Sequence, residues 1–296
     1  MEIAFQKIFS MYFIMISAYF IKKKYRFSVE DINALVFNFF LPITIFYSIV
    51  STPQFQPKEF LLMAGSGITS IGLACLIAVA VSKMLKLGSD HKNTFLLGAS
   101  YGNYGFLGLP IAFAFMGAEG ALLALFYLMG SYLFLYSAGF YVMTGRMSFS
   151  GFIKNPLIIA TVLAMLCVTV GWRPSPLISG CLALANQATF PLSMVVVGGG
   201  LQMKFYLESG NSISTLWASG IKLLLSPVMA YLTGMALGLS FEQLSILVIL
   251  SAMPTGVLVT VFAVTYKGSA ALSNSIVSLT TLISMGTIPL LFLILK

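Results

Sequence analysis

The sequence predicts an all-α integral membrane protein in which ten helices span the bilayer. Hydrophobic residues make up 59% of its 296 residues and charged residues only 8%, a composition that a soluble domain of this size could not solvate. Charges and turn residues also divide the chain into ten apolar segments, and a helix needs about 20 such residues to cross roughly 30 Å of hydrocarbon. The net charge of +8 therefore belongs to short loops beside spans and does not indicate a nucleic-acid partner.

Each apolar segment is predicted as one span, with ends placed to within a few residues. The first and the sixth are short. The first has no small-residue cleavage motif, so we expect it to remain as a span, and Lys7 near its start is expected to reach the membrane interface. In chain order, the predicted spans are 5–21, 32–50, 60–82, 94–115, 120–143, 155–171, 177–201, 213–236, 243–265 and 270–294.

Basic residues in the loops predict the orientation. The loops after odd-numbered spans hold eleven of them, and the termini with the other loops hold four. Because basic residues are enriched in cytoplasmic loops, we expect both termini outside. The eleven are Lys22, Lys23, Lys24, Arg26, Lys83, Lys86, Lys92, Arg146, Lys154, Lys204 and Lys267.

The fourth span is interrupted within a charge-free run that extends from Asn93 to Ala118. Glycine and proline break helices, and a broken helix at bilayer depth is tolerated only where protein or a water-filled cavity surrounds it. Such interruptions indicate a transporter's binding site, although a glycine-lined packing face is the alternative. The breaking residues are Gly102, Gly105, Gly108 and Pro110, with Asn103 among them.

A second break lies in the ninth span and matches the first when the chain is shifted by 151 residues. Asn103 then falls on Pro254, which Gly256 follows two residues later. We therefore expect two inverted five-helix repeats, 1–148 and 149–296, with the broken fourth and ninth helices crossing near the bilayer midplane. Helix N-termini that meet at such a crossing suit an anion.

Several polar residues at membrane depth have more than one interpretation. Asn103 could donate hydrogen bonds to a carboxylate or cap freed backbone groups. Lys222 could attract an anion or pair with a helix C-terminus, or its ammonium could snorkel to the interface. Asn186 and Gln187 could line a cavity or form hydrogen bonds between helices.

The remaining ionisable residues exclude other classes. All eight acidic residues lie at termini, in loops or at span edges, which argues against a cation/proton antiporter. The single histidine, His91, lies in a loop, and no metal-ligand cluster or buried acid–base pair is present, so we expect neither an enzyme nor a cofactor. The odd number of cysteines, Cys75, Cys167 and Cys181, indicates packing residues in apolar runs.

On these motifs the sequence resembles the auxin efflux carrier family over nearly its whole length. The most specific piece is Asn103 followed by Gly108-Leu109-Pro110 in the fourth span. Only Thr144–Lys154 joins the two halves, so the chain resembles a compact prokaryotic member. The other matching pieces are Leu41-Pro42, Asn155-Pro156, Lys222 with Pro227, Met253 to Val257, and Phe262-Ala263 with Tyr266.

The resemblance implies a carrier of a small organic anion, an auxin-like carboxylate or a dicarboxylate, in a prokaryotic inner membrane. Spans one, two, six and seven would form a scaffold and the others a moving transport part. The substrate would lie near Asn103, Gly105 and Val257, with Leu41 facing it, and the protein would be a homodimer at most. We further expect substrate contacts from Pro254, Thr255 and Lys222.

Two alternatives remain open from the sequence. A sodium-coupled organic-anion symporter of the bile-acid carrier type needs no acidic residue, since backbone carbonyls with Asn, Ser or Thr side chains can bind the ion. A passive anion channel or a membrane sensor is the other class, and saturable counterflow would separate a carrier from both.

Overall fold

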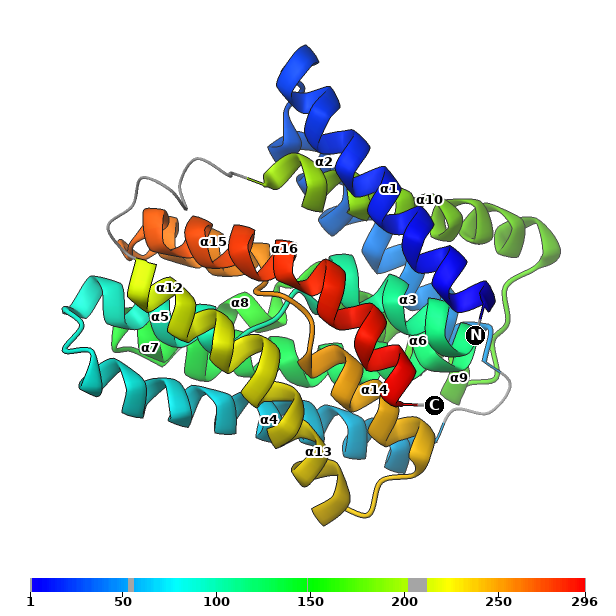
Figure 1. Ribbon diagram of the computed structural model, residues 1–296. Helices are drawn as coiled ribbons and strands as arrows, with labels where there is room; N and C mark the ends of the chain where they lie inside the picture. Colours follow the sequence, from blue (N-terminus) through cyan, green and yellow to red (C-terminus); the bar gives the residue numbers. More distant parts are fainter. Residues whose placement is uncertain (1, 53–55, 148, 202–211, 296) are drawn as a thin grey trace. The chain divides into compact units, whose positions relative to one another are not determined.

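The computed structural model describes residues 2–52, 56–147, 149–201 and 212–295, and its regular elements are helices (Figure 1). Residue 148, at the expected repeat boundary, lies outside the described residues, as does Lys204, one of the basic loop residues.

Six helical stretches of the described chain are long and apolar enough to cross a membrane, which confirms the all-α membrane class. The ten crossings stay a prediction. The fourth and fifth predicted spans share a stretch of 41 residues, bent where Gly117 has a φ of 65°. Two further apolar helices, α9 (Pro156–Thr169) and α14 (Phe241–Ser251), are shorter. The six stretches are Val29–Val50, Pro57–Met84, Tyr104–Thr144, Pro176–Gly200, Ile213–Ala236 and Ala270–Ile294.

The chain forms two compact units. Unit 1 consists of Met1–Phe60, Gly105–Leu125 and Phe149–Gly200. In it α1 (Glu2–Tyr25) packs along α10 (Pro176–Gly200), and α3 (Leu41–Val50) packs along α9. The other helices of unit 1 are α2 (Val29–Leu35), the π-helical turn η1 (Val36–Phe40), α8 (Ser150–Ile153) and the first part of α6 (Leu109–Phe134).

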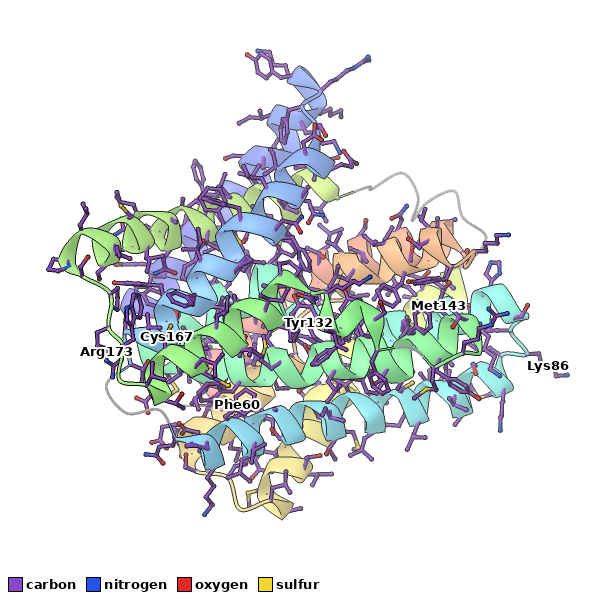
Figure 2. All side chains as sticks on the ribbon, turned by 180° about the vertical axis from the view of Figure 1, so that it is seen from behind. Phe60, Lys86, Tyr132, Met143, Cys167 and Arg173 are labelled. Atoms are coloured by element: carbon purple, nitrogen blue, oxygen red, sulfur yellow. The ribbon has the colours of Figure 1, made fainter. Side chains whose placement is uncertain are left out.

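Side-chain hydrogen bonds cap one helix of unit 1 and join others to each other. The Asn155 side chain accepts a hydrogen bond from the Leu157 N–H, which caps the start of α9. The hydroxyls of Thr44 and Thr189 lie 2.7 Å apart and join α3 to α10. Arg173, labelled in Figure 2, donates to the Val50 carbonyl at the end of α3. Polar pairing of this kind is needed where water is excluded.

Unit 2 consists of Leu61–Tyr104, Phe126–Ser148 and Leu201–Lys296. A buried core that includes Phe95, Leu96, Ile221 and Ile276 joins α5, η4 and α16. Two elements run from one unit into the other: α4 (Pro57–Met84) lies in unit 2 from Leu61 onward, and η2 (Tyr104–Gly108) lies in unit 1 except for Tyr104. The other elements of unit 2 are α5 (Ser89–Ser100), the rest of α6, η3 (Leu135–Gly139), α7 (Phe140–Thr144), α12 (Ser212–Gly220), η4 (Ile221–Leu225), α13 (Ser226–Ala236), α14, α15 (Val257–Thr265) and α16 (Ala270–Ile294).

The units do not coincide with the two halves of the sequence, because each draws on both halves. Unit 1 holds the predicted spans one, two, six and seven, and unit 2 holds three, eight, nine and ten. Within the first half the chain passes between the units after Phe60, after Tyr104 and after Leu125, so two of these boundaries fall inside the predicted fourth and fifth spans. The repeat boundaries 1–148 and 149–296 therefore describe a relation between sequences, which stays a prediction.

Candidate functional site

The first helix break lies between α5 and the π-helical turn η2. Helix α5 ends at Ser100, and Tyr101 adopts an extended conformation with φ −95° and ψ 122°. The chain becomes helical again at Tyr104. Gly102 occupies the middle of the break, where a Cβ atom would come within 2.5 Å of the Tyr104 ring. Only glycine therefore fits there unless the ring moves.

The second break separates α14 from α15. Helix α14 ends at Ser251, and α15 begins at Val257 after its N-cap Gly256. Pro254 lies in the middle of the break and has no N–H to donate to a helix. The segment is fully buried, so its freed backbone groups must find partners in the protein.

The two breaks supply those partners to each other within unit 2. Gly102 and Thr255 form an antiparallel β-bridge. The Asn103 N–H donates to the Pro254 carbonyl at 2.7 Å, and the Gly256 N–H donates to the Tyr101 carbonyl at 3.1 Å. The two residues matched by the shift of 151, Asn103 and Pro254, are thus bonded to each other directly.

The carbonyl end of α5 is capped by side-chain donors. The Thr255 hydroxyl donates to the Gly98 carbonyl at 2.6 Å, and the Tyr104 hydroxyl donates to the Ser100 carbonyl at 3.3 Å. A helix C-terminus carries about half a negative charge on its unpaired carbonyls. The protein itself therefore compensates this end of α5, and the Thr255 proton is already engaged.

The carbonyl end of α14 is capped by Lys222. The Lys222 Nζ donates to the Ser251 carbonyl at 2.6 Å and lies 5.6 Å from the centre of the Tyr104 ring. Its side chain is fully buried, so it does not snorkel. Of the readings that the sequence left open, the structure shows the pairing with a helix C-terminus.

The N-terminal end of α15 has no such compensation. Its N-cap, Gly256, has no side chain to accept from the first-turn N–H groups, and no side-chain cap is present. These N–H groups carry partial positive charge at the break, next to Val257.

The Asn103 side chain is a polar group that is available at the break. It is 4% exposed, and none of the described residues forms a hydrogen bond with its carboxamide, while its backbone N–H is held by Pro254. An amide offers two donors and an acceptor. The arrangement can therefore present donors without a fixed charge.

The structure brings together only part of the predicted site. Asn103, Pro254, Thr255, Val257 and Lys222 all belong to unit 2. Leu41, Gly105, Gly108 and Pro110 belong to unit 1, where Leu41 is fully buried at the start of α3.

Sequence reasoning missed the tyrosines around the break. The Tyr104 ring packs edge-on against Tyr101 and Tyr127, with centroids 5.2 and 4.9 Å apart. It also missed Thr280, whose hydroxyl accepts from the Thr255 N–H at 3.1 Å. A tyrosine beside the break asparagine was a visible signal, since buried tyrosine hydroxyls need partners. Among the described side chains, no group of three potential ligands could hold a metal ion.

Apolar spanning helices and two mutually bonded helix breaks define a membrane transporter. The sequence model of the membrane transport protein family, that of the auxin efflux carriers, matches residues 3–150 and again 140–292, and the chain belongs to this family. The two matches fall on the first and second halves, which indicates an internal repeat. The chain is thus a membrane transport protein and not an enzyme.

Two archaeal proteins show the same relationship over most of their length. An uncharacterized transporter of Methanothermobacter thermautotrophicus is 27% identical over 268 residues, covering 88% of this chain and 87% of its own. An uncharacterized transporter of Methanocaldococcus jannaschii is 27% identical over 277 residues with the same coverage.

Proposed function

We propose that the protein carries a small organic anion across the membrane by alternating access, with the substrate bound where the two helix breaks meet. The observation that carries the proposal is the pair of backbone hydrogen bonds that joins Asn103 to Pro254 and Gly256 to Tyr101. These bonds hold two helix ends and the Asn103 carboxamide in one place, as in transporters whose binding sites lie at discontinuous helices.

The electrostatics of the break favour an anion. The C-terminal ends of α5 and α14 are compensated by Thr255, Tyr104 and Lys222, whereas the N-terminal end of α15 is not. The balance of helix-end charges is therefore positive. A carboxylate that accepts hydrogen bonds from Asn103 and first-turn N–H groups would neutralise this positive charge.

The architecture that belongs to this proposal has ten transmembrane helices in two inverted five-helix repeats, 1–148 and 149–296. Their broken fourth and ninth helices cross near the midplane of a prokaryotic inner membrane. Both termini lie outside, and a homodimer is the largest assembly. The substrate is an auxin-like carboxylate or a dicarboxylate, and in unit 2 it contacts Val257, Pro254, Thr255 and Lys222. The contacts expected from Leu41 and Gly105 stay predictions from the sequence.

Counterflow in proteoliposomes tests the proposal. Vesicles loaded with unlabelled indole-3-acetate, malate or malonate are diluted into the labelled compound, with the proton and sodium gradients collapsed. Saturable, transient accumulation of one label is expected for a carrier. Accumulation that requires sodium would favour the sodium-coupled symporter, and flux without counterflow would indicate a channel. Failure of every carboxylate in this assay would contradict the anion assignment.

A further inference from the structure

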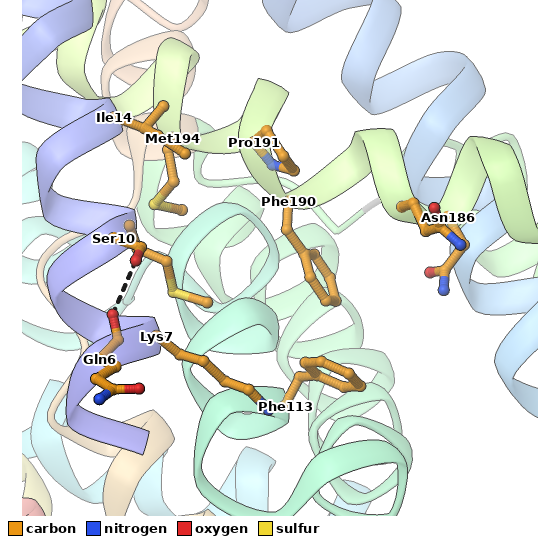
Figure 3. Close-up of a pocket in the computed structure, with 11 residues that line it drawn as sticks. Gln6, Lys7, Ser10, Ile14, Phe113, Asn186, Phe190, Pro191 and Met194 are labelled. Atoms are coloured by element: carbon orange, nitrogen blue, oxygen red, sulfur yellow. Dashed lines mark hydrogen bonds between the residues drawn. The ribbon is translucent and has the colours of Figure 1, made fainter. Parts of the chain in front are cut away.

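A cavity within unit 1 has the properties of a second ligand site. It has a volume of about 550 Å³ and is lined by residues of α1, α10 and the first part of α6 (Figure 3). Small-molecule pockets typically enclose roughly 300–1,000 Å³, with apolar walls and a few converging polar groups.

Lys7 supplies a positive charge to this cavity. Figure 3 shows its side chain extending from α1 toward Phe113, and the ammonium lies 5.0 Å from the centre of that ring. Lys7 is half-buried in the cavity wall, and its reach to the membrane interface stays a prediction. None of the described residues that line this cavity is acidic, so the cavity favours an anion.

Two amides of α10 add neutral hydrogen-bonding groups. Asn186 and Gln187 both line the cavity, as one reading of the sequence suggested. The Asn186 Oδ1 atom is buried, and none of the described residues donates a hydrogen bond to it. Because rotation of the amide exchanges its acceptor for its N–H donors, this group can serve a bound carboxylate.

The other walls are apolar and partly aromatic. The Phe113 and Phe190 rings lie 5.5 Å apart between centroids at an angle of 50°, and Met11, Ile14 and Met194 line the same space. Such a surface suits the apolar body of a ligand.

An adjoining cavity carries negative charge and therefore favours one orientation of an anionic ligand. It has a volume of about 530 Å³, shares Phe113, Asn186 and Phe190 with the first cavity, and holds Glu59 and Glu119. Carboxylates on that side repel an anionic group, so the charged end of a ligand belongs at Lys7 and its apolar body against the two phenylalanines.

We propose that this cavity binds a small carboxylate with an apolar body, for which Lys7 is the counter-ion. The inference does not rest on the proposed transport site, since the paired helix breaks belong to unit 2. It adds a separate binding site to the chain.

Equilibrium binding of phenylacetate to the purified full-length protein tests the proposal, with uncharged phenylacetamide as a matched probe. A ligand of this size is expected to bind with a dissociation constant in the millimolar range. Lys7→Gln should weaken phenylacetate binding roughly tenfold, because it removes a charge-assisted hydrogen bond, whereas Lys7→Arg should restore most of it. The control is Lys58→Gln, which removes another lysine that is exposed and outside both cavities.

Each outcome supports or overturns the second site. The second site is supported when Lys7→Gln weakens phenylacetate binding while Lys58→Gln and Asn103→Ala leave it unchanged. Loss in Asn103→Ala with unchanged binding in Lys7→Gln overturns it and leaves only the site at the breaks. Two results with the parent protein also overturn the second site: phenylacetate does not bind saturably, or phenylacetamide binds as tightly as phenylacetate. Neither measurement depends on whether a variant folds.

Discussion

At the scale of single residues, the pairing of the breaks separates two roles of Asn103. Its backbone N–H is engaged by Pro254, while its carboxamide is bonded to none of the described residues. The structural role thus belongs to the main chain, and the side chain is free for a ligand.

Asn103→Ala should therefore fold normally and lose about 1–3 kcal/mol of substrate binding, the usual cost of leaving a buried polar group unpaired. Asn103→Asp should bind an anion still more weakly, because like charges repel. The measurement is equilibrium binding of the anion identified by counterflow, on variants that remain monodisperse in detergent. Binding of Asn103→Ala as tight as that of the parent would remove the carboxamide from the site.

Lys222→Gln should weaken both stability and anion binding. The variant loses the charge that caps the Ser251 carbonyl, for which we expect roughly 1–3 kcal/mol lower stability. It also removes a positive charge near the α15 N-terminus, so substrate affinity should fall. Thermal unfolding and equilibrium binding measure the two effects separately. A stability equal to that of the parent would mean that another group caps α14.

Gly256→Ala should disrupt the junction of the breaks. A Cβ atom at this position would lie 2.8 Å from the Gly102 carbonyl oxygen, which is backbone and cannot turn away. We expect loss of counterflow and a lower thermal unfolding temperature. The control is Gly286→Ala in α16, where a Cβ atom would meet nothing within 4 Å. Unimpaired transport by Gly256→Ala would show that the junction tolerates separation.

At the scale of elements, helices approach closely where glycine removes the side chain. In unit 1 a Cβ atom on Gly198 of α10 would lie 1.9 Å from the Met15 carbonyl oxygen of α1. Such contacts replace hydrophobic burial as the force between helices in lipid.

Gly198→Ala should thus push α1 away from α10 and lower the thermal unfolding temperature, because overpacking typically costs about 1–3 kcal/mol. Gly180→Ala in the same helix is the matched control, since nothing lies within 4 Å of its added Cβ. Equal unfolding temperatures for the two variants would contradict the close packing of α1 on α10.

The sequence predicted elements better than contacts. The helix breaks at Gly102 and Pro254 were visible because glycine and proline interrupt otherwise uniform apolar runs. The partners of Lys222 and Thr255 were not, because the Ser251 and Gly98 carbonyls are main-chain groups that any residue could supply. The Lys7 side chain points toward the ring of Phe113, which lies 106 positions later in the chain. The local sequence pattern around Lys7 does not indicate so distant a partner.

At the scale of the whole molecule, the loop charges predict that both termini face outward. In a variant without Cys75, Cys167 and Cys181, a cysteine at His91 should react with a membrane-impermeant thiol reagent only from the cytoplasm. A cysteine at Lys58 should react only from outside; both positions are exposed. Labelling in inside-out and right-side-out vesicles measures this, and the reverse pattern would invert the assignment.

The bond between Asn103 and Pro254 also has a consequence for synthesis. At about 5–20 residues per second, the ribosome needs roughly 8–30 s to add the 151 residues that separate donor from acceptor. During that interval the nascent first half has no native partner for the Asn103 N–H, a costly state in lipid. We expect translational arrest between the two breaks to yield chains that membrane proteases remove, and completion of Gly256 to mark the point at which the nascent protein becomes resistant.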